Sequence, residues 1–223
     1  GRSDERYVPY LRNVVLSAYQ VARNPQLMSE LSSPELRGDQ AVLAAMVNER
    51  LPRRPAGFIA GEQALQSIIR YRQEQNDVYA LAESIAELAD WYLMYEQRRA
   101  AEELYLSAWS LLAEEHDSEA LQQSLFGAVI AIPMIITEPR MVDRRALGQG
   151  PESLAEGFVD LSFTVTRNGS VRKINVLSEE NPQNIIQFGS VARALRSFVF
   201  RPVLQDGVPV TTENNCFRVR YWY

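Results

Sequence analysis

The segment "GFVDLSFTVTRNGSVRKINVLS", residues 157–178, has the pattern of a β-hairpin. Its first half has an apolar residue at every second position, namely Val159, Leu161, Phe163 and Val165. This alternation gives a strand one apolar face and one polar face. Asn168–Gly169 follows, and this dipeptide is the strongest short signal for a hairpin turn. The apolar parity slips by one residue in the return strand, so the sequence predicts a β-bulge near Arg172–Lys173.

The residues after this hairpin predict one helix and one further strand. Residues 185–198 place apolar side chains at helical spacing, and residues 201–210 read as a loop with its own Asp-Gly turn. The final run "CFRVRYWY", residues 216–223, alternates apolar residues with arginines. The order strand, strand, helix, strand predicts a small β-β-α-β domain, in which a helix covers a three-stranded antiparallel sheet.

The preceding residues have a different period, with apolar side chains three and four apart from Tyr10 to Ile132. Six helices joined by short connections are expected, including one after Asp39, one capped by Asp77 and a last one at about 118–132. The "LPRRPAG" stretch at 51–57 breaks the pattern. The fold class is therefore α+β. The expected domains are helical hairpins at 5–132, a linker at 133–156 and the sheet domain at 157–223.

One helix pair has the spacing of a tetratricopeptide repeat. In "LADWYLMYEQRRAAEELYLSAW", residues 88–109, small and large residues fall at the repeat's positions: Leu88, Ala89, Tyr92, Ala101, Tyr105 and Ala108. One interpretation makes these residues core and scaffold. The other makes them part of a concave peptide-binding surface, for which Tyr92, Tyr95 and Arg98 are the candidates.

Composition and charge narrow the classes of function. The chain has 223 residues, a net charge of -5 and a pI near 5.1, which argues against a general nucleic-acid binder. Residues 151–223 hold eight basic and seven acidic residues, so the other 15 basic and 21 acidic residues lie before them. An acidic helical part joined to a near-neutral sheet favours two modules. The longest apolar run, at 126–136, is too short to span a membrane.

Few residues are of the types that form catalytic sites, metal sites or disulfides. His116 and Cys216 are the only histidine and the only cysteine, so no internal disulfide can form and zinc-ligand spacing is lacking. We expect His116 in a solvated loop and Cys216 as a partly covered structural thiol. The carboxylates at 101–103 and 113–119 are expected on solvated faces. No nucleophile elbow or phosphate-binding loop occurs, so we expect a non-enzymatic protein without a cofactor or a metal.

The C-terminal region, residues 150–223, resembles the C-terminal domain of TonB-type energy transducers. The matching pieces, in order, are Gly157, "VDLSFTV", Gly169, Val171, Val176, Ala192, Ala194, Leu195, "FRP" at 200–202, "DGVPV" at 206–210 and "FRVRY" at 217–221. The resemblance implies a bacterial protein of the periplasm, associated with transport. Gly150–Pro151 stands where the family usually has Tyr-Pro. We expect no membrane helix or proline-rich spacer in this chain, and whether an anchor or signal peptide precedes Gly1 stays open.

Several hypotheses follow for the last strand. It is expected to bind an extended segment of an envelope protein by β-augmentation, through Phe217, Arg218, Val219, Arg220, Tyr221 and Trp222. Alternatively, this edge packs on the linker or the helices. It also offers a route to a homodimer in which two C-terminal strands pair. A separate hypothesis is an enzyme or small-ligand binder with a site between the two domains.

Overall fold

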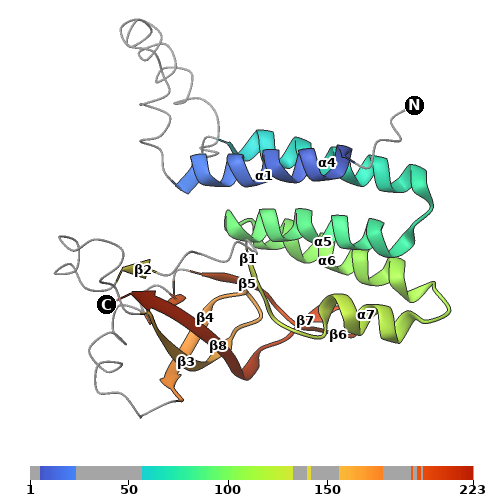
Figure 1. Cartoon of the computed structure of the whole chain (residues 1–223). Helices are drawn as coiled ribbons and strands as arrows, with labels where there is room; N and C mark the ends of the chain where they lie inside the picture. Colours follow the sequence, from blue (N-terminus) through green and yellow to red (C-terminus); the bar gives the residue numbers. More distant parts are fainter. Residues whose placement is uncertain are drawn as a thin grey trace, which may run out of the picture. The chain divides into compact units, whose positions relative to one another are not determined.

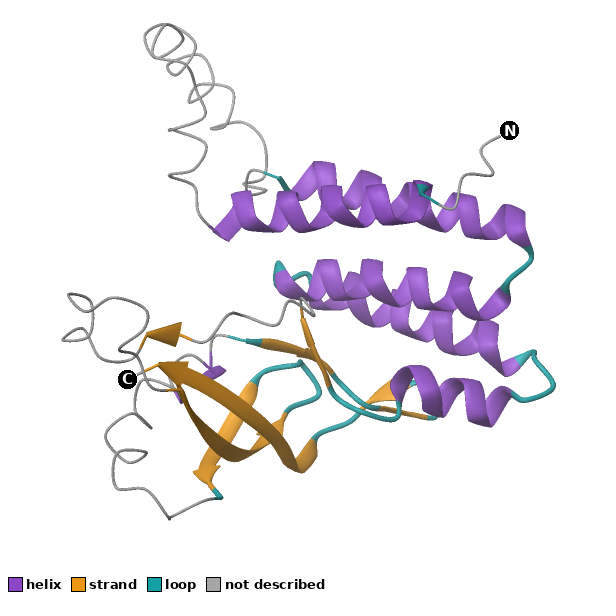
Figure 2. Ribbon diagram, in the orientation of Figure 1, coloured by secondary structure: helices purple, strands orange, loops and turns teal. Residues whose placement is uncertain are grey.

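The computed structural model describes residues 6–23, 57–132, 140–141, 156–177, 192, 195–196 and 198–222 (Figure 1). Helices come first along the chain and strands follow, which confirms the α+β class (Figure 2). The chain divides into two compact units, Gly1–Trp91 and Tyr92–Tyr223. The sheet therefore shares its unit with the helices from Tyr92 onward, whereas the sequence analysis grouped those helices with the rest of the helical part.

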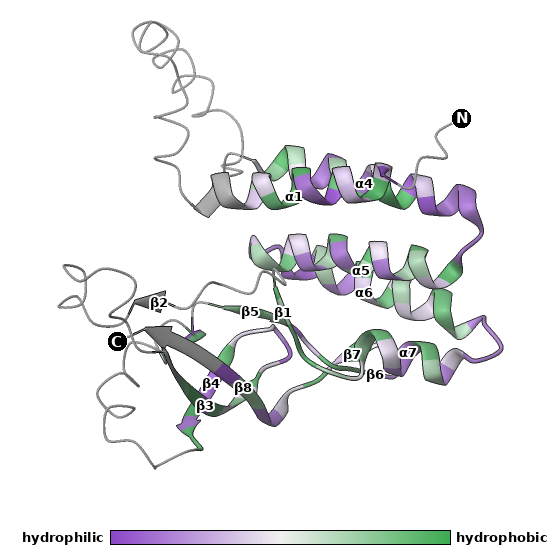
Figure 3. Cartoon of the chain, in the orientation of Figure 1, coloured by the Kyte–Doolittle hydropathy of each residue, from purple (hydrophilic) through white to green (hydrophobic). Residues whose placement is uncertain are grey.

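The first unit contains α1 (Tyr7–Arg23), α4 (Phe58–Gln75) and most of α5 (Val78–Met94). Helices α1 and α4 lie side by side, and hydrophobic and hydrophilic positions are intermixed along both, as in amphipathic helices (Figure 3). Gly57 precedes α4 at φ 88°, where a Cβ would lie 2.4 Å from the Ala18 carbonyl oxygen. The helix expected after Asp39 lies outside the described residues, as does the break at 51–57 apart from Gly57.

The core of the first unit is built around Trp91. Its side chain is 1% exposed, and its ring lies 6.1 Å from the ring of Phe58. The indole Nε1 donates a hydrogen bond to the Phe58 carbonyl oxygen at 3.3 Å. Gly61 makes room for this ring, because a Cβ there would lie 2.2 Å from Trp91 Cζ2. A large aromatic group with a satisfied N–H thus fixes α5 against α4.

The predicted cap of α5 is confirmed. Asp77 directly precedes the helix, and its Oδ1 accepts a hydrogen bond from the backbone N–H of Ala80 at 3.0 Å. This bond satisfies one of the donors that a helix leaves unpaired in its first turn. The helix therefore begins where the sequence pattern indicated.

Replacing Asp77 with alanine is expected to lower the free energy of unfolding by about 1 kcal/mol, because the Ala80 N–H loses its acceptor. Urea unfolding followed by circular dichroism measures the change. Asp117→Ala is the matched control, since Asp117 precedes α7 without a side-chain capping bond and its loss should cost less. Equal losses in the two variants would contradict the capping role of Asp77.

The second unit begins with the last residues of α5, which are followed by α6 (Arg98–Ala113) and α7 (Ser118–Phe126). The helix predicted at 118–132 was too long, because α7 ends at Phe126 and β1 (Ile130–Ile132) follows. Gly127 caps the helix, and the residues after it include β-branched side chains that favour a strand. Strand β1 pairs antiparallel with β5 (Val199–Arg201).

The main sheet has the order β2-β8-β3-β4. Its antiparallel part consists of β8 (Thr212–Trp222), β3 (Glu156–Val165) and β4 (Val171–Val176), which confirms the predicted three-stranded sheet. Strand β2 (Arg140–Met141) adds a parallel two-residue pairing with the end of β8. The predicted helix at 185–198 lies mostly outside the described residues, although Ala192, Leu195 and Arg196 are helical.

The hairpin turn and the bulge are both present. Gly169 adopts φ 73°, and its N–H donates to the Thr166 carbonyl oxygen at 2.8 Å, which closes the turn. Asn168 does not share this left-handed conformation, so the turn is a three-residue loop with glycine at its end. Lys173 and Ile174 together oppose Phe163, because Ser162 pairs with Asn175 and Thr164 with Arg172. The bulge confirms the predicted shift in parity.

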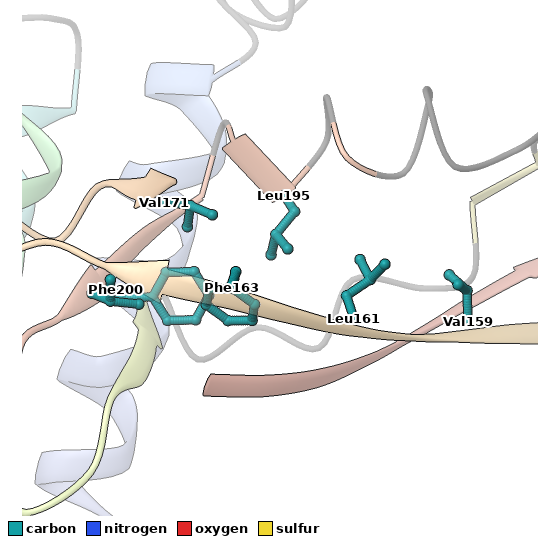
Figure 4. Close-up of a cluster of buried hydrophobic side chains, with 7 residues drawn as sticks. Val159, Leu161, Phe163, Val171, Leu195 and Phe200 are labelled. Carbon is teal, nitrogen blue, oxygen red and sulfur yellow. The ribbon is translucent and has the colours of Figure 1, made fainter. Parts of the chain in front are cut away.

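The alternating residues of β3 form the core of the second unit (Figure 4). Phe163 is 2% exposed, and its ring lies 5.3 Å from the ring of Phe200 in β5. Leu195, from the partly described helical segment, packs into the same cluster with no exposed surface. The full cluster is Val159, Leu161, Phe163, Val165, Val171, Leu195 and Phe200.

The predicted loop at 201–210 contains a short hairpin of its own. Strands β6 (Leu204–Gln205) and β7 (Val208–Pro209) pair antiparallel across Asp206 and Gly207. Both turn residues adopt positive φ, 51° and 75°, as the predicted Asp-Gly turn requires. Gly207 lies against α6, since a Cβ there would be 2.9 Å from Leu106 Cδ1.

Candidate interaction surface

The candidate residues Phe217–Trp222 lie in β8, and the structure determines what each side of this strand pairs with. On one side they oppose Leu161–Glu156 of β3 with no shift in register. On the other side β2 pairs only with Tyr221 and Trp222. Within the described residues, β8 from Thr212 to Arg220 therefore has a strand on one side only. Along this stretch, the side of β8 that faces away from β3 has the geometry that the addition of a partner strand requires.

The direction of the backbone groups along this edge follows from one hydrogen bond. The Leu177 N–H donates to the Asp160 carbonyl oxygen at 2.9 Å, so the backbone groups of Asp160 face β4. Because the direction alternates along a strand, those of Val159 and Leu161 face β8. Their partners Val219 and Phe217 therefore bond to β3. The N–H and C=O of Cys216 and Arg218 consequently point away from β3, toward the side without a partner strand.

The regular part of this edge begins at Asn215. Glu213 and Asn214 form a second bulge, because Phe163 pairs with Asn215 and Val165 with Thr212. Asn214 adopts φ 58°, and the Asn215 side chain stabilises the bulge by donating to the Phe163 and Thr212 carbonyl oxygens at 3.2 and 2.9 Å. A fixed bulge sets the register of the strand beyond it.

The solvent-facing side of β8 carries an ordered charged group. Arg218 bonds the carboxylate of Asp160 through both ends of its guanidinium, with Nε to Oδ1 at 2.7 Å and Nη2 to Oδ2 at 2.8 Å. The Arg218 guanidinium carbon also lies 4.3 Å from the centre of the exposed Phe158 ring. These hydrogen bonds lower the pKa of Asp160 and raise the pKa of Arg218. The pair is solvated, so it positions side chains more than it stabilises the fold.

The opposite edge of the sheet is interrupted. Strand β4 contains the bulge at Lys173–Ile174, and Lys173 adopts φ 48°. Arg172 and Lys173 are both exposed, and Lys173 Nζ lies 2.8 Å from Glu213 Oε1. This hydrogen-bonded ion pair lowers the pKa of Glu213. Bulges and lysine are common means of protecting an edge, so β8 is the better surface for a partner strand.

The candidate residues of the helical surface fall around one turn. Tyr92 lies in the last turn of α5, Tyr95 follows that helix, and Arg98 begins α6. Both tyrosines are half-buried, and only Arg98 is exposed. The Tyr92 carbonyl oxygen accepts hydrogen bonds from the N–H groups of Tyr95 and Gln97 at 3.2 and 2.9 Å, which shapes the turn. Burial of both tyrosines fits the scaffold interpretation better than a binding surface.

The other positions of the repeat-like pattern are buried. Ala89, Ala101 and Ala108 have no exposed surface. Leu88 is 5% exposed and Tyr105 is 1% exposed. Small and large residues at these positions therefore serve packing, as the core interpretation expects.

The remaining chemical groups are placed as follows. His116 is exposed in the turn between α6 and α7, as predicted. Cys216 is more exposed than predicted, with its thiol 3.6 Å from the Asn214 carbonyl oxygen. The described part of the chain holds no group of three or more His, Cys, Asp or Glu residues able to bind a metal ion. Among the described helices, none combines the length and the apolar character that crossing a membrane requires.

A small pocket of about 210 Å³ lies on the first unit. Helices α1 and α4 contribute its lining residues, which are Tyr7, Ser67, Arg70, Tyr71 and Glu74. The rings of Tyr7 and Tyr71 lie 5.4 Å apart, and Arg70 Nη2 donates to Ser67 Oγ at 3.1 Å. The side chains therefore largely engage one another.

Sequence reasoning missed Asp160 and Phe158 as partners of Arg218. The sequence pattern gave neither residue a role in a site. Their contact depends on the register between β3 and β8, in which Asp160 is directly opposite Arg218. The only available signal was the opposite charge of two residues on the polar faces of their strands.

Comparison with models of known protein families finds no match for this chain. A search of curated proteins likewise finds no match. The resemblance to TonB-type domains therefore remains a prediction.

Proposed function

We propose that this chain is a non-enzymatic interaction protein of the bacterial cell envelope that binds an extended segment of a partner protein along β8. The observation that supports this most directly is the one-sided pairing of β8 between Asn215 and Arg220, among the described residues. The resemblance to TonB-type domains supports a periplasmic location and a role connected with transport.

Binding would add a strand to the sheet. The backbone groups of Cys216 and Arg218 point toward the incoming segment and supply hydrogen bonds that do not depend on its sequence. Selectivity would come from side chains, because alternate residues of the added strand lie on the two faces of the sheet. On the solvent-facing side they would meet the ordered group of Phe158, Asp160 and Arg218.

A second contact is proposed at the turn between α5 and α6. Of the three candidate residues there, Arg98 is exposed, whereas Tyr92 and Tyr95 are half-buried. A partner that occupies β8 could also be a second copy of this chain, since one edge serves either occupant. The experiment below separates these two kinds of partner.

Proline at position 218 is expected to abolish partner binding while leaving the sheet folded. The Arg218 N–H points away from β3, so its loss removes a bond to the partner and not one within the sheet. Arg218→Ala is the matched control, because it also loses the Asp160 contact but keeps the N–H. Relative to alanine, proline should cost about 1 kcal/mol of stability. Phe217→Pro should cost about 3 kcal/mol, because it removes a donor to β3.

Cys216 provides the binding measurement, because it is exposed and is the only cysteine. A thiol-linked photo-crosslinker on Cys216 should capture a discrete partner in envelope extracts. The same crosslinker on an otherwise cysteine-free His116→Cys variant should not capture this partner. Position 116 lies in the turn between α6 and α7, far from β8 in the sequence. The product should persist in Arg218→Ala and disappear in Arg218→Pro. Equal capture by both variants would contradict pairing through the backbone. A product twice the mass of the chain would identify a second copy as the occupant.

A further inference from the structure

One arginine of α1 holds two carboxylates of α5. Arg12 Nη2 lies 3.2 Å from Glu83 Oε2 and 2.6 Å from Glu87 Oε1. The two glutamates are four residues apart, so they occupy the same face of their helix. A single positive group therefore serves two negative ones, and it does so between two helices of the first unit.

The pairing of this group is incomplete. Glu87 Oε2 and Arg12 Nε are buried, and neither has a hydrogen-bond partner among the residues that the structure describes. The Glu87 side chain is 26% exposed, against 40% for Glu83. An ionised carboxylate spreads its charge over both oxygens, so a buried oxygen without a donor disfavours the charged form. The ionised form of Glu87 is therefore disfavoured at this position.

Two of the surrounding charges, Glu83 and Asp90, act in the same direction as burial. The pKa of Glu87 is raised above its ordinary value, chiefly by burial, while the attraction of Arg12 opposes the shift. Glu83 and Asp90, on the same helix, raise it further. The pKa of Arg12 is also raised, since its two carboxylate partners outweigh its burial. In the described residues, charged groups of α4 do not contribute to the Glu87 shift.

We propose that Arg12, Glu83 and Glu87 form a proton-responsive clamp. It holds α1 to α5 more firmly at mildly acidic pH than at neutral pH. This inference goes beyond the proposed function and does not depend on β8. It gives the first unit a response to the acidity of its surroundings.

The direction of the effect follows from linkage. The folded chain keeps the Glu87 proton to a higher pH than the unfolded chain, because its folded pKa is raised. This contribution to stability is full below the unfolded pKa and is lost as pH rises through the folded pKa. The clamp should therefore weaken as pH rises from the ordinary pKa of a glutamate through the raised folded pKa of Glu87.

Hydrogen exchange of the α1 amides in the full chain tests the clamp. After correction for intrinsic exchange rates, wild-type protection should be about threefold or more higher at pH 5 than at pH 7.5. Glu87→Gln mimics the protonated side chain, so its α1 protection should no longer fall over this range. Glu83→Gln is the comparison on the same helix face, and it should keep a shallower fall, because it removes one of the negative charges that raise the pKa of Glu87.

A second variant guards against misfolding of the first. Arg12→Gln removes the attraction that keeps Glu87 ionised, so α1 protection should fall more steeply with pH than in the wild type. The proposal is overturned if Glu87→Gln keeps the wild-type pH dependence. It is also overturned if the wild type shows no pH dependence in α1, or if Arg12→Gln flattens it.

Discussion

Replacing Gly169 with alanine is expected to lower the free energy of unfolding of the second unit by about 3 kcal/mol. Gly169 adopts φ 73°, a conformation that costs any L-residue with a side chain about 1–2 kcal/mol. A Cβ would also lie 2.3 Å from the Phe200 carbonyl oxygen, a backbone atom with little freedom to move. Any shift would strain the hydrogen bond from the Phe200 N–H to the Gly169 carbonyl oxygen, which is 2.9 Å long.

Gly207→Ala is the control for this prediction. Gly207 has nearly the same φ, 75°, but its nearest contact is the end of the flexible Leu106 side chain at 2.9 Å. Replacing Gly207 should therefore lower the free energy of unfolding by about 1–2 kcal/mol, which is the cost of positive φ for a residue with a side chain. Urea unfolding of both variants, followed by tryptophan fluorescence and circular dichroism, measures the difference. Equal losses would show that the approach to β5 adds nothing.

A fragment that starts at the predicted linker, residues 133–223, is expected not to fold, whereas residues 92–223 fold. The shorter fragment lacks β1, the antiparallel partner of β5. It also lacks the Leu125 carbonyl oxygen, which accepts a hydrogen bond from Arg201 Nη1 at 3.4 Å. Arg201 is 5% exposed, so the fragment loses one of the hydrogen bonds that compensate the burial of this cation.

The shorter fragment also loses the aromatic packing of the second unit. Phe126 has no exposed surface, and its ring lies 6.1 Å from the ring of Tyr105 and 6.0 Å from that of Trp109. Two-dimensional NMR spectra of the two fragments provide the measurement. Dispersed amide signals are expected for 92–223 only. Dispersed signals with an equal melting temperature for 133–223 would instead support the boundary indicated by the sequence.

The sequence predicted those elements that local signals determine. Strand β3 alternates from Val159 to Val165, and the turn and bulge after it each have a signal within a few residues. Asp77 is next to the helix that it caps. Such features depend on the backbone preferences of neighbouring residues, and these can be read directly from the chain.

The predicted end of α7 was wrong because it depends on a contact with a distant part of the chain and not on a local signal. Residues 126–132 form a short apolar run that fits a buried helix or a buried strand equally well by composition. The choice is made by β5, since Ile130 pairs with Arg201 and Ile132 with Val199. A contact between such distant residues leaves no local pattern.

The candidate surface shows the same division. The sequence identified the strand and its alternation, including Arg218. It did not reveal that Arg218 directs its backbone groups away from β3, nor that Asp160 and Phe158 hold its side chain. Both facts depend on register, which only the pairing of β3 with β8 determines.

The pairing of β3 with β8 also has a consequence for the order in which the second unit assembles. The β3–β4 hairpin closes over a few residues, but every β3–β8 pair, from Val165 with Thr212 to Glu156 with Trp222, closes a loop of roughly 50 residues or more. Such high contact order slows folding, because the entropy of a long loop is lost before the strand pairs compensate for it. The hairpin therefore forms early, and until β8 pairs, the backbone groups on one side of β3 have no partner strand. During that interval the strand most able to recruit β8 is equally able to recruit a foreign strand.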